Sequence, residues 1–142
     1  MANSPSAMRT TEERIETLAA NEVFVFGSNT AGRHSAGAAK AAVKWGARYG
    51  QGHGMAGQTY AIATLDENLE QRPLEDIAHD VSEFISFARQ HAHLTFLVTE
   101  IGCGLAGFSV EGIAPMFSPA VGVENIHLPE RFWGVLEKQM NG

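Results

Sequence analysis

The fold is decided by the stretch Val23-Phe24-Val25-Phe26-Gly27-Ser28-Asn29-Thr30-Ala31-Gly32-Arg33-His34-Ser35-Ala36-Gly37-Ala38-Ala39. Its apolar, β-branched and aromatic start is typical of a strand buried on both faces, and a glycine-rich loop and a helix follow. The same order recurs at residues 96–109, where an apolar run leads into Glu100-Ile101-Gly102-Cys103-Gly104-Leu105-Ala106-Gly107-Phe108-Ser109. In α/β proteins such loops present backbone N–H groups and a helix N-terminus to phosphate groups. Two of them in one chain predict a single shared binding site.

Strands and helices are expected to alternate along the rest of the chain. Apolar runs predict strands at residues 23–26, 60–63, 96–99 and 126–128, with a glycine-rich loop at 50–57. Helical spacing and capping residues predict helices at 11–20, 35–49, 73–91, 109–119 and 130–139. Because a parallel return needs a crossover, we expect an α/β fold, a three-layer α/β/α sandwich around a mostly parallel, mixed sheet. Ligands bind such sheets at the carboxyl ends of the strands, where both glycine loops lie.

Length and composition limit the possible classes of protein. The 142 residues suffice for one domain that buries roughly two thirds of its unfolded surface. We expect residues 1–10 to be a flexible N-terminal segment and residues 11–142 to be the domain. With 44% apolar residues, no run near the ~20 that span a bilayer, no secretion signal and Cys103 as sole cysteine, we expect a cytoplasmic protein without membrane contact. The net charge of −6 argues against a nucleic-acid partner.

Two phosphate-binding motifs fit the glycine loops poorly. Gly102, Gly104 and Gly107 spell G-x-G-x-x-G, but a dinucleotide fold needs an acid at the end of the next strand and a further half-domain. Glu124 precedes that strand, and only 35 residues follow Gly107. Residues 32–37 have the spacing of a P-loop, yet alanines stand where its lysine and hydroxyl belong. A nicotinamide-dependent oxidoreductase is therefore the less favoured alternative, and nucleotide triphosphate hydrolysis is excluded.

The loops also carry the polar side chains best placed to face a ligand. Asn29, Arg33 and His34 lie on the first loop, Glu100 precedes the second, and Asp66 follows another strand. Asn29 has a simpler interpretation as a helix or loop cap, and Arg33 has one as a solvent-exposed charge. Cys103 is a candidate nucleophile without an assignable base, and Phe108 is a candidate for stacking on an adenine or ribose. His91 and His93 are expected to meet a helix end rather than a metal, so neither metal nor cofactor is predicted.

At these loops the chain resembles the macrodomain family of ADP-ribose-binding modules and ADP-ribosyl hydrolases. Ile101-Gly102-Cys103-Gly104-Leu105 is similar to the phosphate loop of its terminal ADP-ribose glycohydrolase branch, and Ser35-Ala36-Gly37-Ala38-Ala39 resembles its earlier helix entry. The resemblance covers residues 23–117 in element order, and residues 24–40 also resemble uncharacterised bacterial and phage proteins. It implies that ADP-ribose or a related adenine nucleotide lies across the strand ends, with its diphosphate on backbone N–H groups and Asn29 near the distal ribose. The residues expected to bind the ligand are Gly27, Ser28, Asn29, Arg33, Ser35, Ala36, Gly37, Ala38, Gly102, Cys103, Gly104, Leu105, Ala106, Gly107 and Phe108.

The family's catalytic residues do not carry over. Ala106 stands where the glycohydrolase branch has an aspartate, and the partner lysine has no match in Thr64-Leu65-Asp66-Glu67. If the chain is an ADP-ribosyl hydrolase, the candidate catalytic residues are Glu100, His34 and Asp66. The alternative is a sensor or sequestering module that binds an ADP-ribose-type ligand without turnover, and the sequence leaves the choice open.

Overall fold

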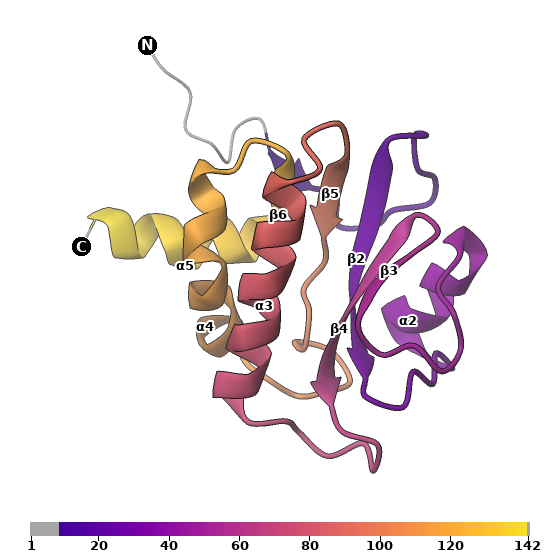
Figure 1. Cartoon of the computed structure of the whole chain (residues 1–142). Coiled ribbons are helices and arrows are strands. Elements are labelled where there is room, and N and C mark those ends of the chain that lie inside the picture. The colour runs from indigo at the N-terminus through magenta and orange to yellow at the C-terminus, as the bar shows by residue number, and fades with distance from the viewer. Residues whose placement is uncertain (1–8, 142) are drawn as a thin grey trace.

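The computed structural model describes residues 9–141, which form a six-stranded sheet in the order β1-β6-β5-β2-β4-β3 (Figure 1). The strands are β1 (Thr10–Thr11), β2 (Glu22–Asn29), β3 (Gly54–Ala56), β4 (Thr59–Leu65), β5 (Thr95–Val98) and β6 (Ile126–Pro129). All neighbouring strands are parallel except β3, which pairs with β4 in antiparallel fashion. The predicted α/β fold with a mostly parallel, mixed sheet is confirmed.

Helices cover both faces of this sheet, which makes it the middle layer of an α/β/α sandwich (Figure 1). One face carries α3 (Leu74–Arg89), α4 (Val110–Ile113), the 3-10 segment η2 (Ala114–Gly122) and α5 (Glu130–Asn141). The other face carries α2 (Gly37–Ala42) and the 3-10 turn η1 (Val43–Trp45). Alternation along β2 serves both layers, since Val23 and Val25 join the larger core cluster and Phe24 and Phe26 join the smaller one. The uninterrupted apolar run of β2 thus follows from burial on both faces.

Helix α3 agrees closely with its predicted range of 73–91. Pro73 precedes its first residue, and Glu75 and Asp76 lie in its first turn, where the helix dipole favours acids. Its apolar stripe is buried and faces the sheet: Ile77, Val81, Phe84, Ile85 and Ala88.

The predicted helix at 11–20 is wrong. Thr10 and Thr11 instead form β1 and pair with Leu128 and Pro129, and residues 12–21 are irregular. Tertiary pairing overrides the weak propensity of a single short helix, which is marginal by itself. The expected apolar contact still exists, because Ile15 and Leu18 pack against the smaller cluster.

The predicted helix at 35–49 is too long. Regular α-helix covers only Gly37–Ala42, and a 3-10 turn continues to Trp45 before Gly46 ends it in a left-handed conformation at φ 110°. A β-carbon on Gly46 would lie 2.9 Å from Cα of Gly57, so the chain turns where it meets the 50–57 segment. The prediction that residues 50–57 are all loop is wrong, because Gly54–Ala56 form β3.

The ends of the described chain are held by long-range contacts. Residues 1–8 of the expected N-terminal segment lie outside the described part. The guanidinium of Arg9 donates to the carbonyls of Ala120, Val121 and Ile126 at 2.8–2.9 Å. The backbone carbonyl of Arg9 accepts a hydrogen bond from the indole N–H of Trp133. None of the helices within residues 9–141 combines the length and the apolar character needed to cross a bilayer.

Candidate functional site

The carboxyl ends of β2, β4 and β5 bring three loops together on one edge of the sheet. Two are the predicted glycine loops, and the third is the connection at residues 66–72 after β4. Gln71 donates from Nε2 to the carbonyl of Ala106 at 2.8 Å, and Arg33 donates to the carbonyl of Glu67 at 3.1 Å. The third loop is therefore bonded to both glycine loops.

The two glycine loops also meet each other directly. Gly27, expected in the loop, lies within β2, and a β-carbon on it would come within 3.3 Å of the backbone nitrogen of Gly102. A β-carbon on Gly37 would lie 3.5 Å from Cδ1 of Leu105. Glycine at these positions lets the loops approach, so the structure brings together the two segments that the sequence paired.

The first loop is braced by its own buried polar side chains. Asn29 is 7% exposed; its Oδ1 accepts from the N–H of Arg33 and its Nδ2 donates to the Arg33 carbonyl, both at 3.0 Å. Ser28 Oγ lies 3.1 Å from Nε2 of His34, whose ring meets Phe26 edge-on. Asn29 and Ser28 thus fix the shape of the loop, and neither presents a free polar group to a ligand.

His34 differs from the other candidates because its buried Nδ1 makes no hydrogen bond of good geometry to a described residue, although the backbone of Gln51 lies close enough to favour the charged ring. His34 is only 5% exposed, and no hydrogen bond to its Nδ1 meets the usual geometry within the described structure. Burial lowers the pKa of His34, and the nearby backbone of Gln51 raises it by a smaller amount. Burial therefore favours the neutral imidazole and holds it away from solvent.

The second loop exposes backbone donors. Its turn is closed by three backbone hydrogen bonds, from Cys103 to Glu100, from Gly107 to Gly104 and from Phe108 to Gly102. Between them, the N–H groups of Gly104, Leu105 and Ala106 bond to no described residue. Leu105 is 82% exposed. This short run of unpaired N–H groups beside the first loop is the feature best suited to an anion.

Two of the three candidate catalytic side chains, Glu100 and Asp66, already bond to other residues. Glu100 forms a bidentate ion pair with Arg131 of α5, at 2.6 and 2.7 Å, and hydrogen bonding from that guanidinium lowers the pKa of Glu100. Asp66 accepts from the backbone N–H groups of Asn68 and Glu70 at 2.8 and 3.0 Å, which shapes the third loop. Glu100 is thus engaged through both carboxylate oxygens, whereas Asp66 accepts both of its bonds at Oδ1 alone.

Cys103 has the properties of an unreactive thiol. Burial is the largest effect on it and raises its pKa to about 11, with a further contribution from Glu100. The Sγ donates to the carbonyl of Ile101. A nucleophilic role needs a lowered thiol pKa, so the geometry does not support one.

A surface groove of about 770 Å³ borders the second loop on the side away from the first. It lies between this loop with α4 and the terminal helix α5. Its lining consists of Cys103, Phe108, Ser109, Val110, Glu111, Arg131, Gly134, Val135, Lys138 and Gln139. Of the residues expected to bind a ligand, only Cys103 and Phe108 line it. The α5 residues were not predicted, because no local motif marks them and only the fold brings them to the loop.

Sequence reasoning also missed the part played by the segment 50–52. Its backbone packs on the first glycine loop so closely that a β-carbon on Gly52 would lie 2.2 Å from the carbonyl oxygen of Asn29. Gly50 donates its N–H to the carbonyl of Gly32 at 2.8 Å. The density of glycines at 50–57 was the available signal, and it marks a close backbone contact as well as flexibility.

His91, near the end of α3, is placed as predicted. His91 stacks on Phe87 with ring centroids 4.0 Å apart, and its Nδ1 lies 2.7 Å from the Phe87 carbonyl. The rings of His91 and His93 are 6.0 Å apart and tilted. His91 therefore meets the helix end, as expected.

Comparison with known proteins adds no assignment to this site: no protein-family model matches the chain, and no curated protein or solved structure matches it significantly.

Proposed function

We propose that the chain binds ADP-ribose or a related adenine nucleotide diphosphate across the two glycine loops. The observation that carries the proposal is the run of N–H groups at Gly104, Leu105 and Ala106, which bond to no described residue and belong to the loop that lies beside the first one. Oriented neutral donors can hold a diphosphate without lysines, which suits a chain of net charge −6. The macrodomain resemblance of both loops supports the choice of ADP-ribose.

The contribution of the first loop is smaller than the sequence implied. Its helix α2 has only six residues, so the dipole expected of a helix at 35–49 is largely missing. Ser35, Ala36, Gly37 and Ala38 remain close to the second loop through the contact of Gly37 with Leu105. We therefore assign the phosphates mainly to the second loop.

Calorimetric titration with ADP-ribose tests this proposal, with Gly104→Glu as the disabling variant. Gly104 has ordinary backbone angles, and a β-carbon there would meet nothing within 4 Å, so the substitution leaves the fold intact. A carboxylate beside the diphosphate is expected to weaken binding by about tenfold or more through charge repulsion. Gly122→Glu is the matched control, because Gly122 is equally unobstructed but lies at the end of η2. Absence of heat up to millimolar ADP-ribose, or equal affinity in both variants, would overturn the proposal.

Binding without turnover is favoured over hydrolysis by the engagement of the candidate catalytic groups. Glu100 is paired with Arg131, Asp66 caps a turn, and Ala106 replaces the acid of the related hydrolases. Only His34 keeps an unpartnered nitrogen, and it is buried. We expect no release of ADP-ribose from an ADP-ribosylated protein over hours. Release that disappears in His34→Gln but persists in Glu100→Gln would contradict this and identify His34 as the active group.

One observation keeps the nicotinamide alternative in view. The second loop joins β5 to the parallel strand β6, and Glu130 directly follows that strand, where a ribose-binding acid is found in dinucleotide folds. The α-helix after the loop has only four residues, however, in place of the usual crossover helix. Titration with NAD alongside ADP-ribose separates the two, since tighter binding of NAD would favour the oxidoreductase.

A further inference from the structure

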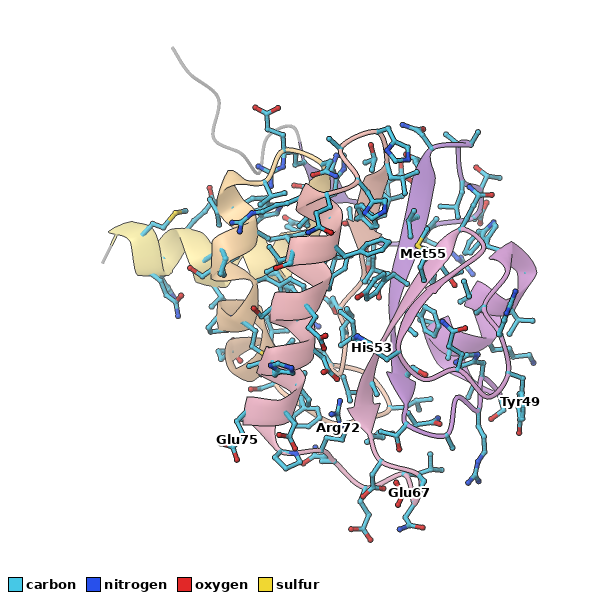
Figure 2. The ribbon with its side chains drawn as sticks, in the orientation of Figure 1. Tyr49, His53, Met55, Glu67, Arg72 and Glu75 are labelled. Atoms are coloured by element: carbon cyan, nitrogen blue, oxygen red, sulfur yellow. The ribbon has the colours of Figure 1, made fainter. Side chains whose placement is uncertain are left out.

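A cluster of metal-ligating side chains lies away from the glycine loops, between α3 and the β3–β4 hairpin. It consists of His53, just before β3, and of Asp80 and Glu83 on α3. One ligand atom from each of the three side chains lies within 4.8 Å of the other two. Figure 2 shows His53 beside α3, above Arg72 of the preceding loop. None of these residues belongs to the glycine loops.

The imidazole of His53 stands between two carboxylates without a hydrogen bond to either. Its Nδ1 is 3.9 Å from Oδ2 of Asp80, and its Nε2 is 3.8 Å from Oε1 of Glu83. Both separations exceed the hydrogen-bond range. The Nδ1 is also buried and makes no hydrogen bond within the described structure. An unsatisfied buried nitrogen facing a carboxylate is costly unless another group completes the contact.

The position of this imidazole is fixed by its surroundings. Gln51 donates from Nε2 to the carbonyls of His53 and Met55, at 3.2 and 3.0 Å, and so clamps the backbone on both sides of the ring. The ring of Tyr60 meets that of His53 edge-on at 5.7 Å. Preorganised ligands lose little freedom on binding an ion, so this bracing favours a metal site.

The charges around the cluster favour the binding of a cation. Arg72 binds Oδ2 of Asp80 at 2.7 Å and offsets one carboxylate, but Glu83 has no such partner and is 53% exposed. His79, one helical turn before Glu83, brings a second imidazole Nε2 to 3.7 Å from the same Oε1.

We propose that one imidazole nitrogen of His53, together with the carboxylates of Asp80 and Glu83, binds a divalent first-row cation such as Zn²⁺. Imidazole and carboxylate groups together suit this class of ion, and a gathering of the ligand atoms by about 1 Å brings them to ordinary coordination distances of about 2.0–2.2 Å from a shared centre. The carboxyl-bearing side chain of Glu83 is exposed and free to make that adjustment. The ion would tie the β3–β4 hairpin to α3.

Calorimetric titration of the metal-free full chain with Zn²⁺ alone tests this site independently of ADP-ribose. We expect saturable binding of a single equivalent, weakened at least about tenfold by His53→Ala and by Glu83→Gln. The second variant guards against misfolding of the first, because Glu83 is a surface side chain whose amide has the same shape. Replacement of Zn²⁺ by Co²⁺ supplies a second readout, a visible absorption band that both variants should lose.

His93→Ala is the matched control, since His93 is an exposed histidine near the other end of α3 and should leave binding unchanged. Equal Zn²⁺ affinity in the wild type, His53→Ala and Glu83→Gln would overturn the proposal. So would a loss of binding confined to His93→Ala, or a wild-type protein that shows no saturable binding.

Discussion

The close contact between the first glycine loop and the segment 50–52 predicts very different effects for two alanine substitutions. Gly32 and Gly50 both have positive φ, 68° and 94°, so alanine at either position meets a backbone cost of about 1–2 kcal/mol. A β-carbon on Gly32 would also lie 2.3 Å from the nitrogen of Gln51 and 2.4 Å from the carbonyl carbon of Gly50. A β-carbon on Gly50 would meet nothing within 4 Å.

The extra cost of Gly32→Ala follows from what must move. Relief of the overlap needs a backbone shift of about 1 Å, comparable to overpacking that costs about 1–3 kcal/mol. The shift also strains the 2.8 Å hydrogen bond from Gly50 to the carbonyl of Gly32, a further ~1 kcal/mol. The effect of alanine on the unfolded chain is similar at both sites and cancels in the comparison. We expect Gly32→Ala to lower the free energy of unfolding by about 2–4 kcal/mol more than Gly50→Ala.

Urea unfolding, followed by the fluorescence of the buried Trp133, measures the difference directly. The two variants should share the wild-type dependence on urea and differ in midpoint. If their free energies of unfolding agree within about 0.5 kcal/mol, the two segments are not in backbone contact, and the account of the first loop given above is wrong.

Three further outcomes are expected. Phe84 is fully buried, with the rings of Tyr60 and Phe96 at 5.0 and 5.5 Å, so Phe84→Ala should cost about 3–5 kcal/mol and lower Tm by roughly 10 °C; a calorimetric scan that shows little change would contradict the packing. Cys103, whose pKa is raised to about 11, should react with iodoacetamide at pH 8 at least about tenfold more slowly than a free thiol, and rapid labelling by mass spectrometry would refute its burial. The hydrogen bond from Arg131 lowers the pKa of Glu100, so the pair stabilises the fold at pH values above the ordinary pKa of glutamate. That stability is lost as the pH falls through the lowered pKa of the folded state. The difference in free energy of unfolding between wild type and Glu100→Gln, measured by urea unfolding, should therefore be larger at pH 7 than at pH 3.

Elements with strong periodic patterns could be predicted from the sequence. Strands β2, β4, β5 and β6 and helix α3 all lie where apolar runs or a helical stripe placed them, within a few residues. These patterns reflect burial against a whole sheet, which is the main source of stability in each element. The placement of both glycine loops at one sheet edge followed from the alternation of strands and helices.

Predictions failed where distant contacts decide the local structure. Residues 11–20 carry acids and apolar spacing that suit a helix, yet β1 is formed by pairing with β6, more than a hundred residues away. Helix α2 gives way to a 3-10 turn after Ala42, and that turn ends at Trp45, just before Gly46 meets Gly57. No window of sequence around either segment contains these partners.

The candidate site divides in the same way. The backbone donors of the second loop could be foreseen, because glycines and their position after a strand mark them. The pairing of Glu100 with Arg131, by contrast, joins β5 to the terminal helix. The contact of Gln71 with Ala106 likewise joins loops that are separate in sequence. Glu100, which looked available for catalysis, is therefore already engaged.

The contacts of Arg9 and β1 have a consequence for the order of events during synthesis. Their partners lie at residues 120–133, so they emerge from the ribosome only after nearly all of the chain has been made. Until then the first strand has no neighbour, and the larger part of the sheet can assemble around β2, β4 and β5 without it. Strand β1 is thus among the last of the described elements to join the folded domain, although it is translated before the other strands.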